Sequence, residues 1–174
     1  MIKYFYFIAI CIMLTGCAMV QQVIKSSFPY TTTLTIPASA AAGTEQMAIS
    51  RATSFDQNFV KSGNNATRIN NVRIVGAKLQ SAEPSDYNLG NLSTVKIYMS
   101  KANGSEEVLV ASQTEIVRNN GNTLVLNTDN SHFLDEHVRE PHVRVRMIYT
   151  LRKKEFVDAT LKLVLSLTAD RVAN

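Results

Sequence analysis

Tryptophan is absent from this chain, and cysteine occurs only at positions 11 and 17. The sequence after Cys17 can therefore form no disulfide and offers no thiol nucleophile, so packing alone has to stabilise its fold. Sugar-binding surfaces usually rely on exposed aromatic rings. Without tryptophan, and with only Tyr87 and Tyr98 expected at the surface, the chain is a poor match for a carbohydrate-binding platform.

Long apolar runs are equally scarce, and the one that stands out lies at the start of the chain. A single charge, Lys3, precedes an apolar run from Tyr4 to Leu14, and two small residues follow it. This order of charge, apolar core and small residues is typical of a secretory signal peptide. The run is too short to cross the roughly 30 Å hydrocarbon layer as a permanent helix. We therefore expect residues 1–16 to be a cleaved signal.

The signal ends in Leu14-Thr15-Gly16-Cys17, which resembles the lipobox of bacterial lipoproteins. In that family the cysteine thiol receives a diacylglyceryl group, the signal is cut before it, and the new amino terminus is acylated. The resemblance implies that Cys17 is the lipidation site and the attachment to the membrane. Each buried methylene contributes about 0.8 kcal/mol, so two or three acyl chains hold a protein stably on a bilayer.

The residue after the cysteine, Ala18, bears on the location of such a protein. In lipoproteins an aspartate at this place often retains the protein in the inner membrane, so alanine implies the outer membrane. No acidic cluster follows, which favours the periplasmic leaflet over the cell surface. Removal of Lys3 with the signal lowers the formal net charge from +4 to +3. This weak positive balance predicts no nucleic-acid partner.

Alternation of apolar and polar residues dominates the rest of the sequence and predicts strands. Asn103-Gly104 is a strong hairpin signal between two of them, and Gly76 is expected to form a bulge. The strands favour an all-β fold, an antiparallel two-sheet sandwich with an immunoglobulin-like Greek key, and a closed barrel is the alternative. The eight predicted strands are 31–37, 46–52, 71–80, 94–100, 107–112, 122–127, 142–151 and 156–168.

Two short helices are predicted to cover the ends of this sandwich or the crossovers between its sheets. The first, residues 54–63, begins with a Ser-x-x-Gln capping box and ends at a glycine. The second spans residues 131–141. It is expected to bury Phe133, Leu134 and Val138. The predicted organisation is a signal peptide at 1–16, a lipidated cysteine and tether at 17–29, a β-sandwich domain at 30–170, and a tail at 171–174.

The last two predicted strands, 142–151 and 156–168, carry their apolar residues at odd positions. Residues that face each other across an antiparallel hairpin lie on one side of the sheet. The loop must therefore have an odd length, with Leu151 opposite Val157, for both apolar rows to face the core. This register sets three basic residues side by side on the outer face, with Arg146 directly opposite Lys162. It predicts an anion-facing patch of Arg144, Arg146 and Lys162.

All three histidines, His132, His137 and His142, lie close together among several carboxylates. Imidazole and carboxylate both bind zinc, so this density raises the question of a metal site. However, His132 and His137 are five positions apart, which is about 140° around a helix, and they do not share a face. We expect a solvated helix face here, and neither a metal nor another cofactor.

Motifs of catalysis do not stand out in this sequence. It has no Gly-x-Ser-x-Gly nucleophile elbow, and no two of its carboxylates are marked as a pair. The sequence therefore favours a non-catalytic binding or structural module of the envelope, with an anionic envelope polymer or envelope proteins as partners. The alternative is an accessory subunit of a larger secretion, pilus or transport assembly. A hydrolase is the third hypothesis.

Overall fold

A computed structural model describes residues 25–52 and 69–171 of the chain, with side chains from 27 to 50 and from 69 to 170. The predicted signal peptide, Cys17 and the predicted helix at 54–63 lie outside the described residues. Residues 25–29, which were expected to belong to a tether, form the beginning of the first strand.

The described residues are mainly β-strand, as the alternation predicts. The turn at Asn103-Gly104 forms, with the backbone N of Gly104 donating to the carbonyl O of Lys101 at 2.8 Å. A register shift between Ile74 and Gly76 confirms the predicted bulge. The strands are β1 Lys25–Ile36, β2 Glu45–Ala52, β3 Ile69–Glu83, β4 Leu92–Lys101, β5 Val108–Thr114, β6 Thr123–Thr128, β7 Val143–Leu151 and β8 Ala159–Arg171; the short helices are η2 Leu89–Asn91 and α3 Asp135–Arg139.

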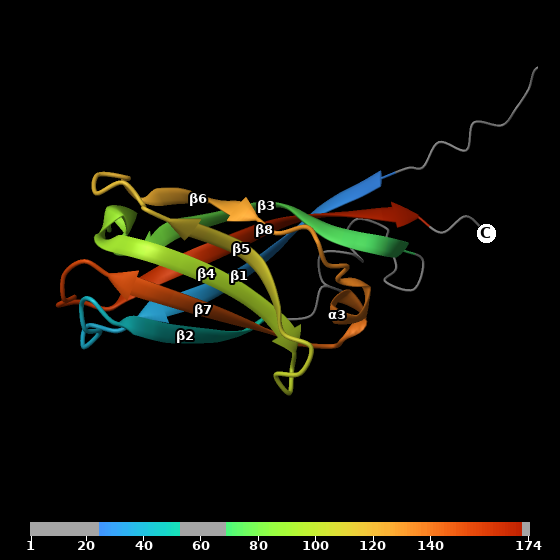
Figure 1. Cartoon of the computed structure of the whole chain (residues 1–174), viewed down its shortest axis with the longest axis horizontal. Helices are drawn as coiled ribbons and strands as arrows, with labels where there is room; N and C mark the ends of the chain where they lie inside the picture. The colour runs from blue at the N-terminus through green and yellow to red at the C-terminus, as the bar shows by residue number, and fades with distance from the viewer. Residues whose placement is uncertain (1–24, 53–68, 172–174) are drawn as a thin grey trace, which may run out of the picture.

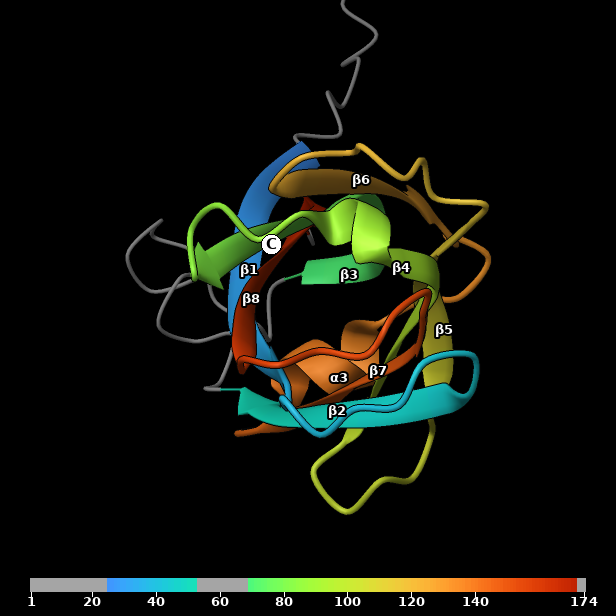
Figure 2. The same ribbon diagram turned by 90° about the vertical axis from the view of Figure 1, so that its left-hand side faces the viewer.

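Hydrogen bonds join the described strands in one antiparallel eight-stranded sheet, in the order β1-β8-β3-β6-β5-β4-β7-β2. The sheet curls until its edge strands β1 and β2 come together (Figure 2). The hydroxyls of Thr32 and Ser50 form a hydrogen bond of 2.7 Å across this seam. The result is a nearly closed barrel. The expected immunoglobulin-like sandwich of two sheets is not confirmed, although the order β3-β6-β5-β4 is that of a Greek key.

Apolar side chains that alternate along the strands fill the inside of the barrel. On β7 the odd residues from Val143 to Leu151 are at most 1% exposed, and on β8 those from Ala159 to Leu167 are fully buried. Burying one such side chain contributes about 1.5–3 kcal/mol. The predicted inward faces of these two strands are therefore confirmed.

The pairing predicted for β7 and β8 is wrong. β7 lies between β4 and β2, and β8 lies between β1 and β3. The loop that joins them crosses one end of the barrel, and Val157, which was expected in the core, is exposed. Alternation indicates which face of a strand is buried, but it carries no information about the neighbours of that strand. Consecutive strands are adjacent in only about two thirds of cases.

A short helix lies at each end of the barrel (Figure 1). The buried residues of η2 lie at the end where β1 finishes and β8 begins. α3 lies at the opposite end, where Leu134, just before the helix, and Val138, within it, are buried. This helix is shorter than predicted, because it begins only at Asp135. Phe133 precedes it and is exposed instead of buried, with the guanidinium of Arg73 4.0 Å from its ring centre.

Candidate binding pocket

A pocket of about 360 Å³ opens at the η2 end of the barrel. Its lining comes from three loops: residues 84–91, which contain η2, residues 115–122 between β5 and β6, and residues 152–158 between β7 and β8. This end is opposite the one at which β1 begins (Figure 1). Two of these loops, 84–91 and 152–158, cross the barrel end between strands that are not neighbours, whereas the loop 115–122 joins the adjacent strands β5 and β6.

Asn88 and Gly90 hold the η2 loop against the loop between β5 and β6. The Asn88 Oδ1 accepts hydrogen bonds from the backbone N of Gly90 at 2.8 Å and of Gly121 at 3.1 Å. The Asn88 Nδ2 donates to the carbonyl O of Arg118 at 3.1 Å. A Cβ on Gly90 would overlap the backbone of Arg118. Only glycine permits this close approach, so Gly90 sets how tightly the two loops meet.

The pocket contains a buried carboxylate, Glu155, which is 7% exposed. Its Oε1 accepts hydrogen bonds from the Tyr87 hydroxyl, at 2.5 Å, and from the Asn91 Nδ2. Burial and the bond to Glu155 raise the pKa of Tyr87 far above its ordinary value. The two donors offset the cost of burying a carboxylate. Glu155 is part of the pocket lining, and its Oε2 has no hydrogen bond to another residue that the structure describes.

The side chains of Asn91 and Arg152 fix the loop between β7 and β8. The Asn91 side chain donates to the carbonyl O of Lys153 at 3.3 Å and accepts from its backbone N at 3.1 Å. The Arg152 guanidinium donates to the carbonyl O of Gly90 at 2.8 Å and of Ile116 at 2.6 Å. Because this guanidinium joins all three loops, it has a fixed position in the pocket wall.

Positive charge dominates the lining of the pocket. Arg118, Arg152 and Lys153 accompany a single carboxylate, Glu155. None of these three cations forms an ion pair with another residue that the structure describes. The lining contains no histidine, cysteine or serine. The arrangement is suited to binding and orienting a polar ligand.

The three residues of the expected anion-facing patch are not brought together. Lys162 lies on β8, between β1 and β3, whereas Arg144 and Arg146 lie on β7, between β4 and β2. The guanidinium of Arg146 is ion-paired with Glu107 and lies 4.8 Å from the ring centre of Tyr98. The register from which the patch was predicted does not form, since β7 and β8 are not paired.

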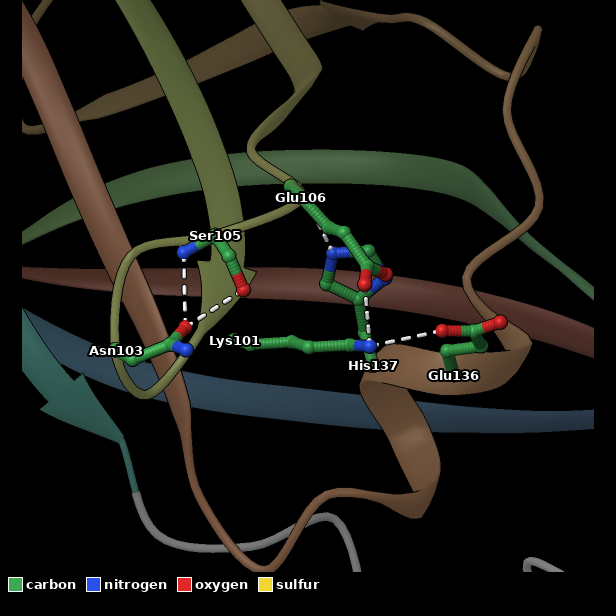
Figure 3. Close-up of polar contacts among 6 residues, drawn as sticks. All are labelled: Lys101, Asn103, Ser105, Glu106, Glu136 and His137. Carbon is green, nitrogen blue, oxygen red and sulfur yellow. Dashed lines mark hydrogen bonds and ion pairs between the residues drawn. The ribbon is translucent and has the colours of Figure 1, made fainter.

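The three histidines lie in and beside α3, at the end of the barrel away from the pocket. Figure 3 shows His137 together with Lys101, Glu106 and Glu136. His137 is buried, contrary to the expected solvated face, and its Nε2 lies 2.8 Å from the carbonyl O of Glu106. The Lys101 Nζ lies 2.5 Å from Glu106 Oε1 and 2.8 Å from Glu136 Oε2, and its hydrogen bond lowers the pKa of Glu136. These contacts fasten α3 to the hairpin between β4 and β5. Among the described residues, no three metal-binding side chains are grouped to hold an ion.

No pattern in the sequence singles out the pocket residues. Tyr87 was expected at the surface, but it is buried because its hydroxyl reaches Glu155. Asn91 and Glu155 are 64 positions apart, and no local pattern indicates that they meet. Two features of the sequence could have indicated this region. They are Gly90 between asparagines in Asn88-Leu89-Gly90-Asn91 and the basic loop after β7. Both are also typical of ordinary turns.

No protein-family model matches the chain, and no curated protein matches it in sequence. Within residues 25–52 and 69–171, no helix has the length and the apolar character needed to cross a membrane. The function therefore has to be inferred from the residues of the pocket and from the sequence itself.

Proposed function

We propose that this chain is a lipid-anchored protein of the bacterial outer membrane, facing the periplasm, whose barrel is a non-catalytic binding module. Acylated Cys17 is its attachment, as the lipobox resemblance implies. The pocket at the η2 end is the place where it binds a ligand. The observation that carries this proposal is the lining of that pocket, which combines three cations with a buried carboxylate whose Oε2 has no hydrogen bond within the described residues.

The position of the pocket suits an anchored binding protein. β1 begins at the α3 end, and residues 18–24 are all that separates Cys17 from it. At about 3.4 Å per residue, this segment reaches at most roughly 25–30 Å. β1 has 12 residues and so extends about 40 Å towards the η2 end. Acylation of Cys17 would hold the α3 end near the bilayer and turn the pocket away from it.

The pocket is also formed in advance. Asn88, Asn91 and Arg152 link its three loops through hydrogen bonds to backbone groups. A ligand that enters such a site orders few additional groups, and most of its interaction energy is retained as affinity.

A steric block of the pocket tests the binding function. Lys153→Trp places a large ring in the lining, and Lys154→Trp is the matched control on the next residue, which is exposed and outside the lining. We expect a small-molecule extract of the cell envelope to raise the Tm of the full-length wild type, purified in detergent, and of Lys154→Trp, but not of Lys153→Trp. Equal shifts in all three proteins, or no shift in the wild type, would contradict pocket binding.

A second candidate function is an accessory subunit of a larger secretion, pilus or transport assembly. It is favoured by apolar side chains in the loops around the pocket, where Val117 is 68% exposed and Phe156 is 84% exposed. Exposed apolar groups that lie together often mark protein contacts. For such a subunit, replacing Val117 and Phe156 with serine should remove cross-links to other envelope proteins in intact cells. Cross-links that persist in this double variant would exclude contact through these residues.

A further inference from the structure

We infer that the pocket binds a small organic anion that also carries hydroxyl groups, which is the chemistry of an acidic sugar. This inference rests on the proposed binding function and adds the class of ligand. Its first support is the charge of the lining, where Arg118, Arg152 and Lys153 outnumber the single carboxylate of Glu155. Within the described residues these cations have no carboxylate partner, unlike Lys96, Lys101 and Arg146 elsewhere on the barrel.

The cations differ in how they would act on an anion. Arg152 is held by the backbone carbonyls of Gly90, Leu92 and Ile116, so its guanidinium supplies a fixed positive charge. Arg118 and Lys153 are exposed, and their side chains can close over a carboxylate or phosphate at the outer part of the pocket. Hydrogen bonds between charged partners are about twice as strong as those between neutral ones, which favours an anion over a neutral ligand here.

Glu155 determines which chemical group of the ligand can bind beside it, at the end away from the ligand's anionic group. Its Oε1 accepts hydrogen bonds from Tyr87 and Asn91, whereas its Oε2 has no partner within the described residues and, as a carboxylate oxygen, can only accept hydrogen bonds. A hydroxyl donates to such an oxygen, and a second anionic group is repelled by it. The ligand is therefore oriented, with a hydroxyl towards Glu155 and its anionic group towards Arg118 and Lys153.

The size of the pocket agrees with a small ligand. Its volume of about 360 Å³ lies near the lower end of the range of roughly 300–1,000 Å³ that is typical of ligand pockets. The site can hold a single small unit or the end of a chain. It does not require the flat aromatic surface on which long polysaccharides are usually bound.

Calorimetric titration of the full-length protein in detergent tests the class of ligand. The probes are glucuronate, which has hydroxyls and a carboxylate, glucose, which has hydroxyls alone, and acetate, which has a carboxylate alone. We expect glucuronate to bind at least tenfold more tightly than either of the others, and its affinity to fall as salt is raised, because the outer cations are exposed. Glucose that binds as tightly as glucuronate, or glucuronate that does not bind, overturns the inference.

Variants assign the binding to the pocket. Arg118→Gln with Lys153→Gln should weaken glucuronate at least tenfold, whereas Lys154→Gln, a neighbouring exposed lysine outside the lining, should leave it unchanged. Glu155→Gln keeps acceptors for Tyr87 and Asn91 but replaces the free oxygen with a donor, so it should weaken glucuronate and not acetate. Equal binding by all variants overturns the inference.

The outcome for the ligand class is separable from that for the proposed function. If Lys153→Trp abolishes the shift caused by envelope extract while glucuronate fails to bind, the pocket is a binding site for another class of ligand. If the extract has the same effect on Lys153→Trp and Lys154→Trp, and glucuronate also fails, both the function and the ligand class are wrong.

Discussion

A single carboxylate organises the pocket at the scale of individual residues. Glu155 follows two lysines in an exposed loop, yet it is buried because Tyr87 and Asn91 donate to its Oε1. Asn91 also binds the backbone of Lys153, so the amide that stabilises the carboxylate positions the loop that carries it. A buried polar network of this kind is stable only when its members are satisfied, and loss of one donor should be felt by the others.

Tyr87→Phe tests this network and its dependence on pH. The variant keeps the ring and removes the donor to Glu155. A hydrogen bond to a charged group contributes about 1.5–3 kcal/mol. We therefore expect the free energy of unfolding at pH 8 to fall by about that amount. The pKa of Tyr87 is raised in the folded state from the ordinary value of 10.0. Its contribution is therefore fully present below pH 10 and is lost as the pH rises above it.

The difference in stability between wild type and Tyr87→Phe should consequently shrink by about 1 kcal/mol for each pH unit above 10. Urea unfolding at pH 8 and pH 11 measures it. Tyr98→Phe, on the outer face of β4 and outside the network, is the control for general effects of removing a hydroxyl. A difference between wild type and Tyr87→Phe that is the same at both pH values would show that the Tyr87 hydroxyl does not titrate as this burial requires.

At the scale of elements, the pocket depends on how closely η2 approaches the loop between β5 and β6. The η2 loop joins β3 to β4, which are not adjacent in the sheet, and so it has to cross the barrel end. Its buried residue Leu89 closes that end of the core. The same crossing brings Asn88 and Gly90 against Arg118. The binding pocket is thus a consequence of the Greek-key order of the strands.

Gly90→Ala should separate these loops. The new Cβ would overlap backbone atoms of Arg118, which cannot move aside without displacing the whole loop. We expect a loss of about 3 kcal/mol in the free energy of unfolding, at the upper end of the usual cost of overpacking. Gly76→Ala is the matched control, because the nearest atom to its Cβ would be the Ser166 Cβ at 3.4 Å, an ordinary contact. Urea unfolding compares the two, and equal losses would refute the special role of Gly90.

The sequence predicts elements well and their neighbours poorly. Alternation along the chain identifies all the described strands and the buried odd residues of β7 and β8, because burial of one face acts on each strand separately. It does not predict that β7 and β8 lie apart, so Val157 was placed in the core and Arg146 beside Lys162. Tyr87 and Glu155 are 68 positions apart, and their contact exists only once the loops cross the barrel end.

At the scale of the whole molecule, the two ends of the barrel differ in what they offer. The α3 end holds the start of β1 and the ion pairs of Lys101. The η2 end holds the pocket, the three cations of its lining and the exposed side chain of Phe156. Under the proposed anchoring through Cys17, the first end faces the lipid and the second faces the periplasm, which separates attachment from binding.

This orientation can be measured with single cysteines, because residues 18–174 contain none. Ala102→Cys carries a donor dye at the hairpin near α3, and Lys154→Cys carries it at the η2 end. With the acylated protein in vesicles that contain acceptor-labelled lipid, we expect stronger energy transfer from position 102, since the barrel length of about 40 Å separates the two ends. A Cys17→Ser variant that lacks residues 1–16 has neither an acylated cysteine nor the apolar run at 4–14, so it should show no transfer from either position. Equal transfer in the acylated protein would mean that the barrel lies flat, and stronger transfer from position 154 would turn the pocket to the bilayer. In that case lipid head groups would become the first anions to test against Arg118 and Lys153.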